Sequence, residues 1–253
     1  EGVYEITPLE EALKKLEEYQ PPADDGSGND SGGDEGAGNQ KPAIIPVTEE
    51  ELKDYIKLEG KVHGSYQYPD MLVSPGIINP GINWHDSHAR LHQQELVMLP
   101  IREFVDYLNL LKSGKAYNTK GNKIPEAELE RIFNELTEVK GPYRATWLDA
   151  QFKLINEILY INYKHRTING QLIPQVSQPL EECLMQDKTP GIDLAYWLKN
   201  ANNQGLPTVN NKDGSMYYWY PRNECFGGFW ADSVRVDLLC SRDPQDSDPG
   251  LGV

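Results

Sequence analysis

The chain has 253 residues, enough for one large domain or two small ones, and 38% of them are hydrophobic. Its 39 Asp and Glu residues outnumber 24 Lys and Arg residues, which gives a formal net charge of −15 at pH 7. Such a chain repels phosphate backbones and anionic lipid, so we expect no nucleic-acid binding, and without a run of about 18 apolar residues we expect no membrane insertion.

The first 45 residues are expected to form a short helix and a linker. In residues 1–20, Thr7 and Glu10 have the spacing of a capping box, and apolar residues then recur at intervals of three and four, as on one helical face. Residues 21–45 begin with a tract rich in Gly, Ser, Asn and acidic side chains, which is typical of a flexible linker. The remaining residues, 46–253, are expected to form one folded domain.

Within that domain, the pattern predicts helices first and strands later. Residues 47–58 are predicted to form a short helix capped by Thr48. The apolar spacing in 101–114 and 124–141 predicts two amphipathic helices. Residues 154–166, followed by TING and a second apolar run, predict two strands joined by a turn. The rest reads as short strands and loops, so the predicted class is α+β with antiparallel strands late in the chain.

Three histidines stand close together in the segment WHDSHARLHQQE. His85, His88 and His92 are spaced i, i+3 and i+7, which places them on one helical face, and Asp86 adds a carboxylate. Zinc and iron sites use such residues, but the HExxH motif is absent. Histidines bonded to backbone groups are the more frequent outcome of such a pattern. We therefore predict no metal site here and keep a metal-dependent enzyme as an alternative hypothesis.

Other chemical motifs are absent from the sequence. There is no G-x-S-x-G, P-loop or G-x-G-x-x-G motif, and no pair of carboxylates is singled out by its spacing. Cys183, Cys225 and Cys240 lack the spacing of a metal site, and an odd number argues against a disulfide framework, although one pair could bridge in a protein that works outside the cell. We expect no enzymatic activity and no cofactor.

Aromatic residues are concentrated in residues 216–230, MYYWYPRNECFGGFW. Tyr and Trp offer large, rigid contact area and are enriched at binding hot spots. The alternative is a core strand. Alternation along strands would place one set inside, which we expect to include Tyr217, Trp219 and Trp230, and expose the other set.

Residues 227–253 combine a regular frame with irregular content. They begin GGFW and end LGV, and the residues between these points follow no pattern. This frame resembles the C-terminal part of the C-type lectin fold in its formylglycine-generating-enzyme-like branch, and within it the variable proteins of diversity-generating retroelements, including the archaeal viral kind. The resemblance covers mainly 216–253 and more loosely 142–215. It implies a C-type-lectin-like domain over 46–253 with a variable region at about 217–253.

In that family a reverse transcriptase randomises adenines of a template copy, so that AAY codons for Asn become NNY codons. A fixed scaffold then displays the products as a ligand-binding surface. NNY codons cannot encode Glu, so Glu224 is expected to be constant. The resemblance implies a solvent-facing, ligand-binding role for a set of residues that NNY codons can encode: Asn223, Cys225, Phe226, Phe229, Ala231, Asp232, Val234, Asp237, Leu239, Ser241, Asp243, Asp246 and Asp248.

The aspartates among these residues favour a basic or hydrogen-bond-rich target. Enzymes of the same branch use a cysteine-based copper site. Cys225 and Cys240 do not have its spacing, so that activity is not expected here.

The leading hypothesis is a receptor-like or adhesin-like protein at a virion or cell surface, bound to an unknown protein or surface ligand. One alternative is a metal-dependent enzyme of the same fold that uses His85, His88 and His92. Another is a structural virion subunit that oligomerises through its N-terminal helix. Lectin-like loops often hold calcium, but the sequence shows no ligand set for it.

Overall fold

The computed structural model describes residues 54–76, 78, 81–242 and 251–252. The predicted N-terminal helix and the linker lie outside the described residues. So do Asp243, Asp246 and Asp248 of the predicted binding surface.

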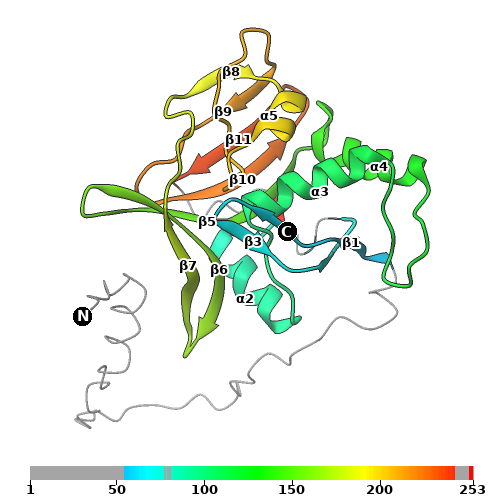
Figure 1. Cartoon of the computed structure of the whole chain (residues 1–253), viewed down its shortest axis with the longest axis horizontal. Coiled ribbons are helices and arrows are strands. Elements are labelled where there is room, and N and C mark those ends of the chain that lie inside the picture. Colours follow the sequence, from blue (N-terminus) through cyan, green and yellow to red (C-terminus); the bar gives the residue numbers. More distant parts are fainter. Residues whose placement is uncertain (1–53, 77, 79–80, 243–250, 253) are drawn as a thin grey trace, which may run out of the picture. The chain divides into compact units, whose positions relative to one another are not determined.

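The described part of the chain is a mixed α+β structure with four helices and one large sheet (Figure 1). The helices are α2 (Trp84–Gln93), α3 (Ile101–Ser113), α4 (Glu126–Thr137) and α5 (Leu194–Asn200). The strands of the large sheet are β5 (Arg144–Ile155), β6 (Ile158–Ile168), β7 (Gln171–Pro179), β8 (Lys188–Ile192), β9 (Met216–Tyr218), β10 (Cys225–Ala231), β11 (Val236–Ser241) and β12 (Leu251–Gly252). The predicted α+β class is confirmed.

Seven of these strands follow one another in the order β7-β6-β5-β10-β11-β9-β8, and β12 pairs with β5 outside this path. The pairs β9–β11 and β5–β12 are parallel, and the other described pairs of the sheet are antiparallel. Two small antiparallel pairs precede the sheet in the chain: β1 (Ile56–Leu58) with β4 (Met71–Val73), and β2 (Lys61–His63) with β3 (Tyr66–Tyr68).

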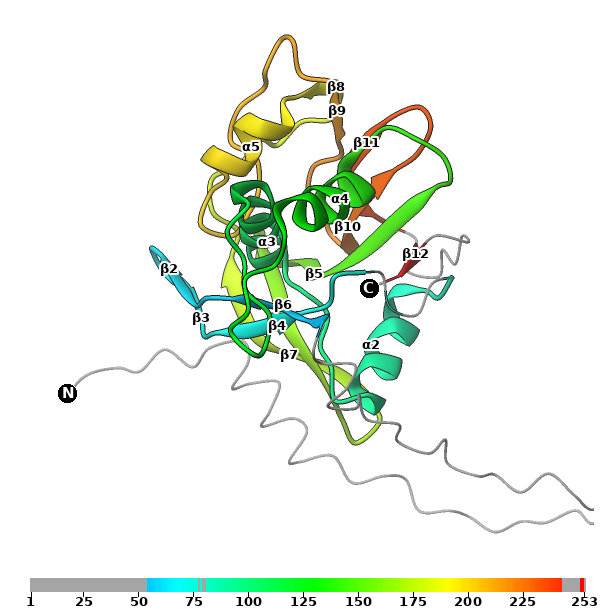
Figure 2. The same cartoon turned by 90° about the vertical axis from the view of Figure 1, so that its right-hand side faces the viewer.

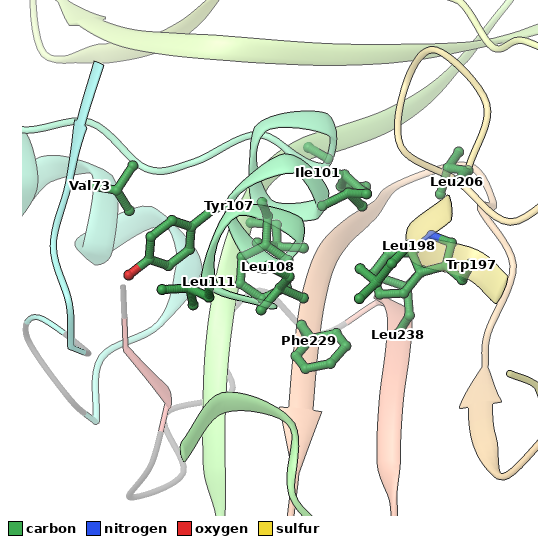
Figure 3. Close-up of a cluster of buried hydrophobic side chains, with 14 of the residues drawn as sticks. Val73, Ile101, Tyr107, Leu108, Leu111, Trp197, Leu198, Leu206, Phe229 and Leu238 are labelled. Carbon is green, nitrogen blue, oxygen red and sulfur yellow. The ribbon is translucent and has the colours of Figure 1, made fainter. Parts of the chain in front are cut away.

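Helices pack on both faces of the large sheet. On one face, side chains of α3 and α5 form the main core with alternate residues of β5, β10 and β11 (Figure 3). On the other face, Trp84 and Leu91 of α2 pack with Ala145, Trp147 and Phe226 in a second core. Figure 2 shows α2 well apart from α3, α4 and α5. The central strands are therefore covered on both sides.

The predicted elements agree with the structure in most places. The helices predicted over 101–114 and 124–141 are α3 and α4, and the predicted turn at TING joins β6 to β7. The helix predicted over 47–58 is wrong where the structure describes it, because Ile56–Leu58 is strand β1. Ile56 and Leu58 point inward and Lys57 outward, which is the alternation of a strand paired with β4.

Helix α3 is buried nearly all round, although its apolar residues occupy one stripe. Two of its buried carboxylates, Glu103 and Asp106, are hydrogen-bonded to tyrosines of β3. Glu103 accepts a hydrogen bond from the Tyr66 hydroxyl, and Asp106 accepts one from the Tyr68 hydroxyl (2.6 Å) and pairs with Arg102 (2.9 Å). These contacts fasten β3 to the helix at the centre of the domain. Burial raises the pKa of the Glu103 carboxyl to about 7.

We expect Glu103→Gln to change how stability depends on pH. A carboxyl whose pKa is raised on folding stabilises the protein fully below its unfolded pKa of about 4.5, and this contribution is lost as pH rises through its folded pKa. Gln keeps an acceptor for Tyr66 but does not ionise. Relative to wild type, the variant should gain on the order of 3 kcal/mol between pH 4 and pH 8.

Urea unfolding followed by tryptophan fluorescence at several pH values measures this difference. Glu130→Gln, at an exposed position on α4, is the matched control and should follow the wild-type profile. An unchanged profile for Glu103→Gln would contradict the raised pKa.

Candidate functional site

The predicted binding surface lies mainly on the antiparallel pair β10–β11. The register runs from Phe226 opposite Ser241 to Ala231 opposite Val236. The turn between the strands is closed by Asp232, whose Oδ1 accepts hydrogen bonds from the backbone N–H groups of Val234 (2.6 Å) and Arg235 (2.8 Å). An aspartate that bonds the backbone two residues ahead is a common device for such turns.

Six of the ten predicted surface residues that the structure describes are not at the surface. The prediction that they face solvent is wrong for a set of buried side chains: Cys225, Phe226, Phe229, Ala231, Asp237 and Leu239. The reason is that alternation exposes one set of side chains only where one face of a sheet meets water. Here α3 and α5 cover one face, while α2 and the side chains around Asp237 cover much of the other, so residues of both sets are buried.

The glycine pair of β10 reflects the same crowding. A Cβ atom on Gly227 would lie 3.1 Å from Cβ of Ala150, on the face covered by α3. A Cβ atom on Gly228 would lie 3.1 Å from Nε1 of Trp230, on the opposite face. Both contacts are tighter than ordinary packing, so the pair belongs to the core of the sheet.

Two predicted variable residues have specific structural partners. Figure 3 shows the Phe229 and Trp197 side chains, whose rings stack with centroids 5.9 Å apart. The Phe229 ring also contacts Phe104 of α3, with centroids 5.1 Å apart. Cys225 forms a disulfide with Cys240, whose Cα atom is 5.4 Å away. The structure therefore has the single bridged pair that the sequence left open. Any other residue at either position would remove a core contact or the crosslink.

Four of the predicted residues do reach solvent. Asn223 and Val234 are exposed, and Asp232 and Ser241 are half-buried. Val234 is the most open, with 76% of its surface exposed at the tip of the β10–β11 turn. Asn223 accepts a hydrogen bond from the Leu154 backbone N–H (2.7 Å), so its side chain also holds β5.

The aromatic side chains expected inside are partly exposed instead. Met216 and Tyr218 of β9 point into the main core, which turns Tyr217 to the opposite face, and Trp219 and Trp230 are also half-buried. The predicted alternation is present in β9, but its inward and outward sets are interchanged there.

These exposed aromatics surround Asp237. The Asp237 carboxylate accepts hydrogen bonds from Nε1 of Trp219 (3.3 Å) and Nε of Arg235 (2.8 Å). The Arg235 guanidinium lies 5.0 Å from the centre of the Tyr217 ring, and Trp230 stands opposite Asp237 in the register. Burial raises the pKa of the Asp237 carboxyl, and Arg235 offsets only part of this effect. We call Tyr217, Trp219, Trp230, Val234 and Arg235 the β9–β11 patch.

The three histidines of the sequence cluster, His85, His88 and His92, do not point to one common site. Asn83 caps α2 by accepting from the Asp86 backbone N–H (2.8 Å), and His85 and Asp86 are exposed. The Thr167 backbone N–H donates to Nδ1 of His92 (3.2 Å), which leaves the His92 Nε2–H to donate to the His165 carbonyl (3.1 Å). Both ring nitrogens of His92 are therefore hydrogen-bonded to β6, and this side chain links α2 to that strand.

His88 points inward and meets two residues that the sequence did not place beside it. Its Nε2 lies 3.5 Å from Oδ1 of Asp149 on β5. The same oxygen is hydrogen-bonded to Nδ1 of His165 on β6, and the His165 backbone N–H donates to Oδ2 (3.0 Å). All three residues are buried. The sequence signal for Asp149 was a carboxylate inside the apolar strand TWLDAQF, but nothing linked it to His88.

Burial controls the charges of this cluster. Burial lowers the pKa of His88 to about 3, so its imidazole is neutral near pH 7. Burial alone would raise the pKa of Asp149, but His165 and His88 outweigh it and hold the pKa below its ordinary value. The cluster thus combines one carboxylate with buried imidazole nitrogens.

One further feature of ligand size is a cavity of about 470 Å³. It lies between β4, the segment before α3 and the start of β5, and its described lining is mostly apolar, with Leu72, Val97 and Trp147 among the large side chains. The charged residues in this lining, Asp70 and Glu95, are exposed. None of the predicted site residues contributes to it.

We expect Phe229→Ala to lower the free energy of unfolding by about 3–5 kcal/mol, because the ring is enclosed between α3 and α5. Val234→Ala, on the same pair of strands, should change it by less than about 0.5 kcal/mol. Chemical denaturation of both variants measures the contrast. If both substitutions changed the free energy of unfolding by equally small amounts, Phe229 would have to be exposed, which would contradict the packing.

Comparison with known proteins provides no relative. No protein-family model matches the chain, and neither a curated protein nor a solved structure is significantly similar to it. Among the described residues, none of the helices combines the length and apolar character needed to cross a membrane.

Proposed function

We propose that this chain is a non-enzymatic binding protein, receptor-like or adhesin-like, built on a C-type-lectin-like scaffold. Its contact surface is the β9–β11 patch, which includes Val234 at the tip of the β10–β11 turn. The observation that carries this proposal is the group of partly exposed aromatic and arginine side chains held around the buried Asp237.

The chemistry of the patch favours binding. Trp, Tyr and Arg are the residue types most enriched among binding hot spots. Asp237 engages both Trp219 and Arg235, so these side chains are already ordered and lose little conformational freedom when a partner docks. Val234 adds an exposed apolar contact beside them.

Diversification by a retroelement, which the C-terminal frame suggests, must affect fewer positions than the sequence implied. Random NNY codons at Phe229 or Ala231 would place polar side chains in the core at a cost of several kcal/mol. Changes at Asn223, Asp232 and Val234 avoid this cost. Asp237 no longer counts toward an acidic surface, because it is buried and paired with Arg235.

A location outside the cytoplasm, at a virion or cell surface, fits this proposal. The disulfide between Cys225 and Cys240 lies in the strands that support the patch. Disulfides persist in oxidising surroundings such as the cell exterior and are rare in the cytosol.

Sequencing the DNA around the gene tests the diversification. We expect a near-copy of the 3′ end in which adenines replace bases in the codons of Asp232, Val234 and Ser241, beside a reverse-transcriptase gene. The codons of Cys225 and Phe229 should be identical in the two copies. Differences at those two codons would contradict the restriction of diversification to exposed positions. The absence of any such copy would remove diversification from the proposal.

The patch itself is tested with peptides selected on the purified protein from a random phage-displayed library. Trp219→Ala and Arg235→Ala should each weaken the selected peptides at least tenfold, measured by calorimetry. Val62→Ala is the control, because Val62 is 73% exposed on the separate strand β2. Peptides that lose affinity with the control but not with the patch variants would place the binding surface elsewhere.

A further inference from the structure

Three polar side chains meet beneath α2 from three different elements. His88 comes from α2, Asp149 from β5 and His165 from β6, and their exposed fractions are 1%, 1% and 3%. Trp84 covers them, with its ring 4.4 Å from that of His88 and 5.1 Å from that of His165 between centroids. Trp84 is fixed in turn by a hydrogen bond from its Nε1 to the Leu148 carbonyl (3.0 Å).

Hydrogen bonds within the protein do not satisfy this cluster. Both ring nitrogens of His88 and Nε2 of His165 are buried and have no hydrogen-bond partner. Each such nitrogen costs roughly 1–3 kcal/mol when it is withdrawn from water unpaired. A helix held only by apolar packing would be more stable with Leu or Met in place of His88. The neutral His88 ring therefore has a buried lone pair with no hydrogen-bond donor, which points to a ligand that accepts it.

The donor set and its spacing suit a transition-metal ion. One donor atom from each of His88, Asp149 and His165 lies within 4.8 Å of the others. The 3.5 Å between Nε2 of His88 and Oδ1 of Asp149 is close to the roughly 3.3 Å that separates two ligands on a tetrahedral zinc ion. Two imidazoles and one carboxylate are a common set for Zn²⁺ and similar divalent ions.

We propose that His88, Asp149 and His165 bind one divalent transition-metal ion of the zinc class, which fastens α2 to the sheet. The ion binds Nε2 of His88, Oδ1 of Asp149 and Nδ1 of His165. The hydrogen on Nδ1 of His165 moves to Nε2 of the same ring, so that the imidazole stays neutral, and a water molecule completes the coordination. Because the ligands are enclosed by α2 and Trp84, the ion is structural. His85 and His92 are not ligands, since His85 is exposed and His92 is bonded to β6.

The metal site is independent of the β9–β11 patch, because the two share no residue. Its failure would leave the proposed binding function intact. The competing occupant of the same space is a buried water molecule, which also satisfies unpaired polar atoms.

The experiment uses the full chain, purified without a histidine tag and stripped with a chelator. We expect it to take up one Zn²⁺ per chain by mass spectrometry of metal content, to show visible absorption bands with Co²⁺, and to unfold at a higher temperature with metal than without. A folded chain that binds less than about a tenth of an equivalent would overturn the proposal in favour of water.

Variants identify the ligands. His88→Gln and Asp149→Asn should each weaken Zn²⁺ binding by roughly 100-fold or more, since the loss of an outer partner alone costs about 10–100-fold. His85→Gln, on the same helix but exposed, is the matched control and should bind as wild type. If a ligand variant fails to fold, the Co²⁺ spectrum of the wild type still reports nitrogen and oxygen ligands. Full affinity in folded His88→Gln would overturn the assignment.

Discussion

Burial of strand β10 on all sides is the constraint on which the rest of the structure depends. The strand is bonded to β5 along one edge and to β11 along the other, while α3 and α5 cover one face and α2 shares the other. Such a position leaves Trp230 as the single side chain of this strand that is partly exposed. It explains the glycine pair, the enclosed Phe229 ring and the disulfide to Cys240.

This constraint also determines where a partner can bind. Apart from Trp230, the side chains of β10 serve packing, whereas the turn before β11 and the outward side of β9 keep their side chains in contact with water. The side chains of the patch are ordered by the buried Asp237, which accepts hydrogen bonds from Trp219 and Arg235. A rigid scaffold with a small, prearranged surface is the physical basis for the binding function that we propose.

The second face of the sheet depends on α2 in a different way. Helix α2 is short, and its buried stripe mixes Trp84 and Leu91 with the polar His88. Two hydrogen bonds near the helix ends place its middle over Asp149. They run from Trp84 to the Leu148 carbonyl and from His92 to the His165 carbonyl. Polar groups in such an enclosed place stabilise the fold only when they are paired. The proposed ion supplies that pairing and links the helix to both β5 and β6.

The sequence by itself determined the class of the fold, the place of α3 and α4 in the chain, and the β6–β7 hairpin, because periodicity and turn residues act locally. Helix α4 ends at Thr137, four residues before the predicted end. Tertiary structure decided the rest. Ile56 and Leu58 form a strand because β4 pairs with them, and Tyr217 faces outward because Met216 and Tyr218 enter the core. Asp149 and His165 meet because β5 pairs with β6, and His88 reaches them because α2 packs over these strands, which no local pattern encodes. Whether a strand's second face meets water or a helix likewise depends on distant segments, and that is why the predicted surface proved to be largely core.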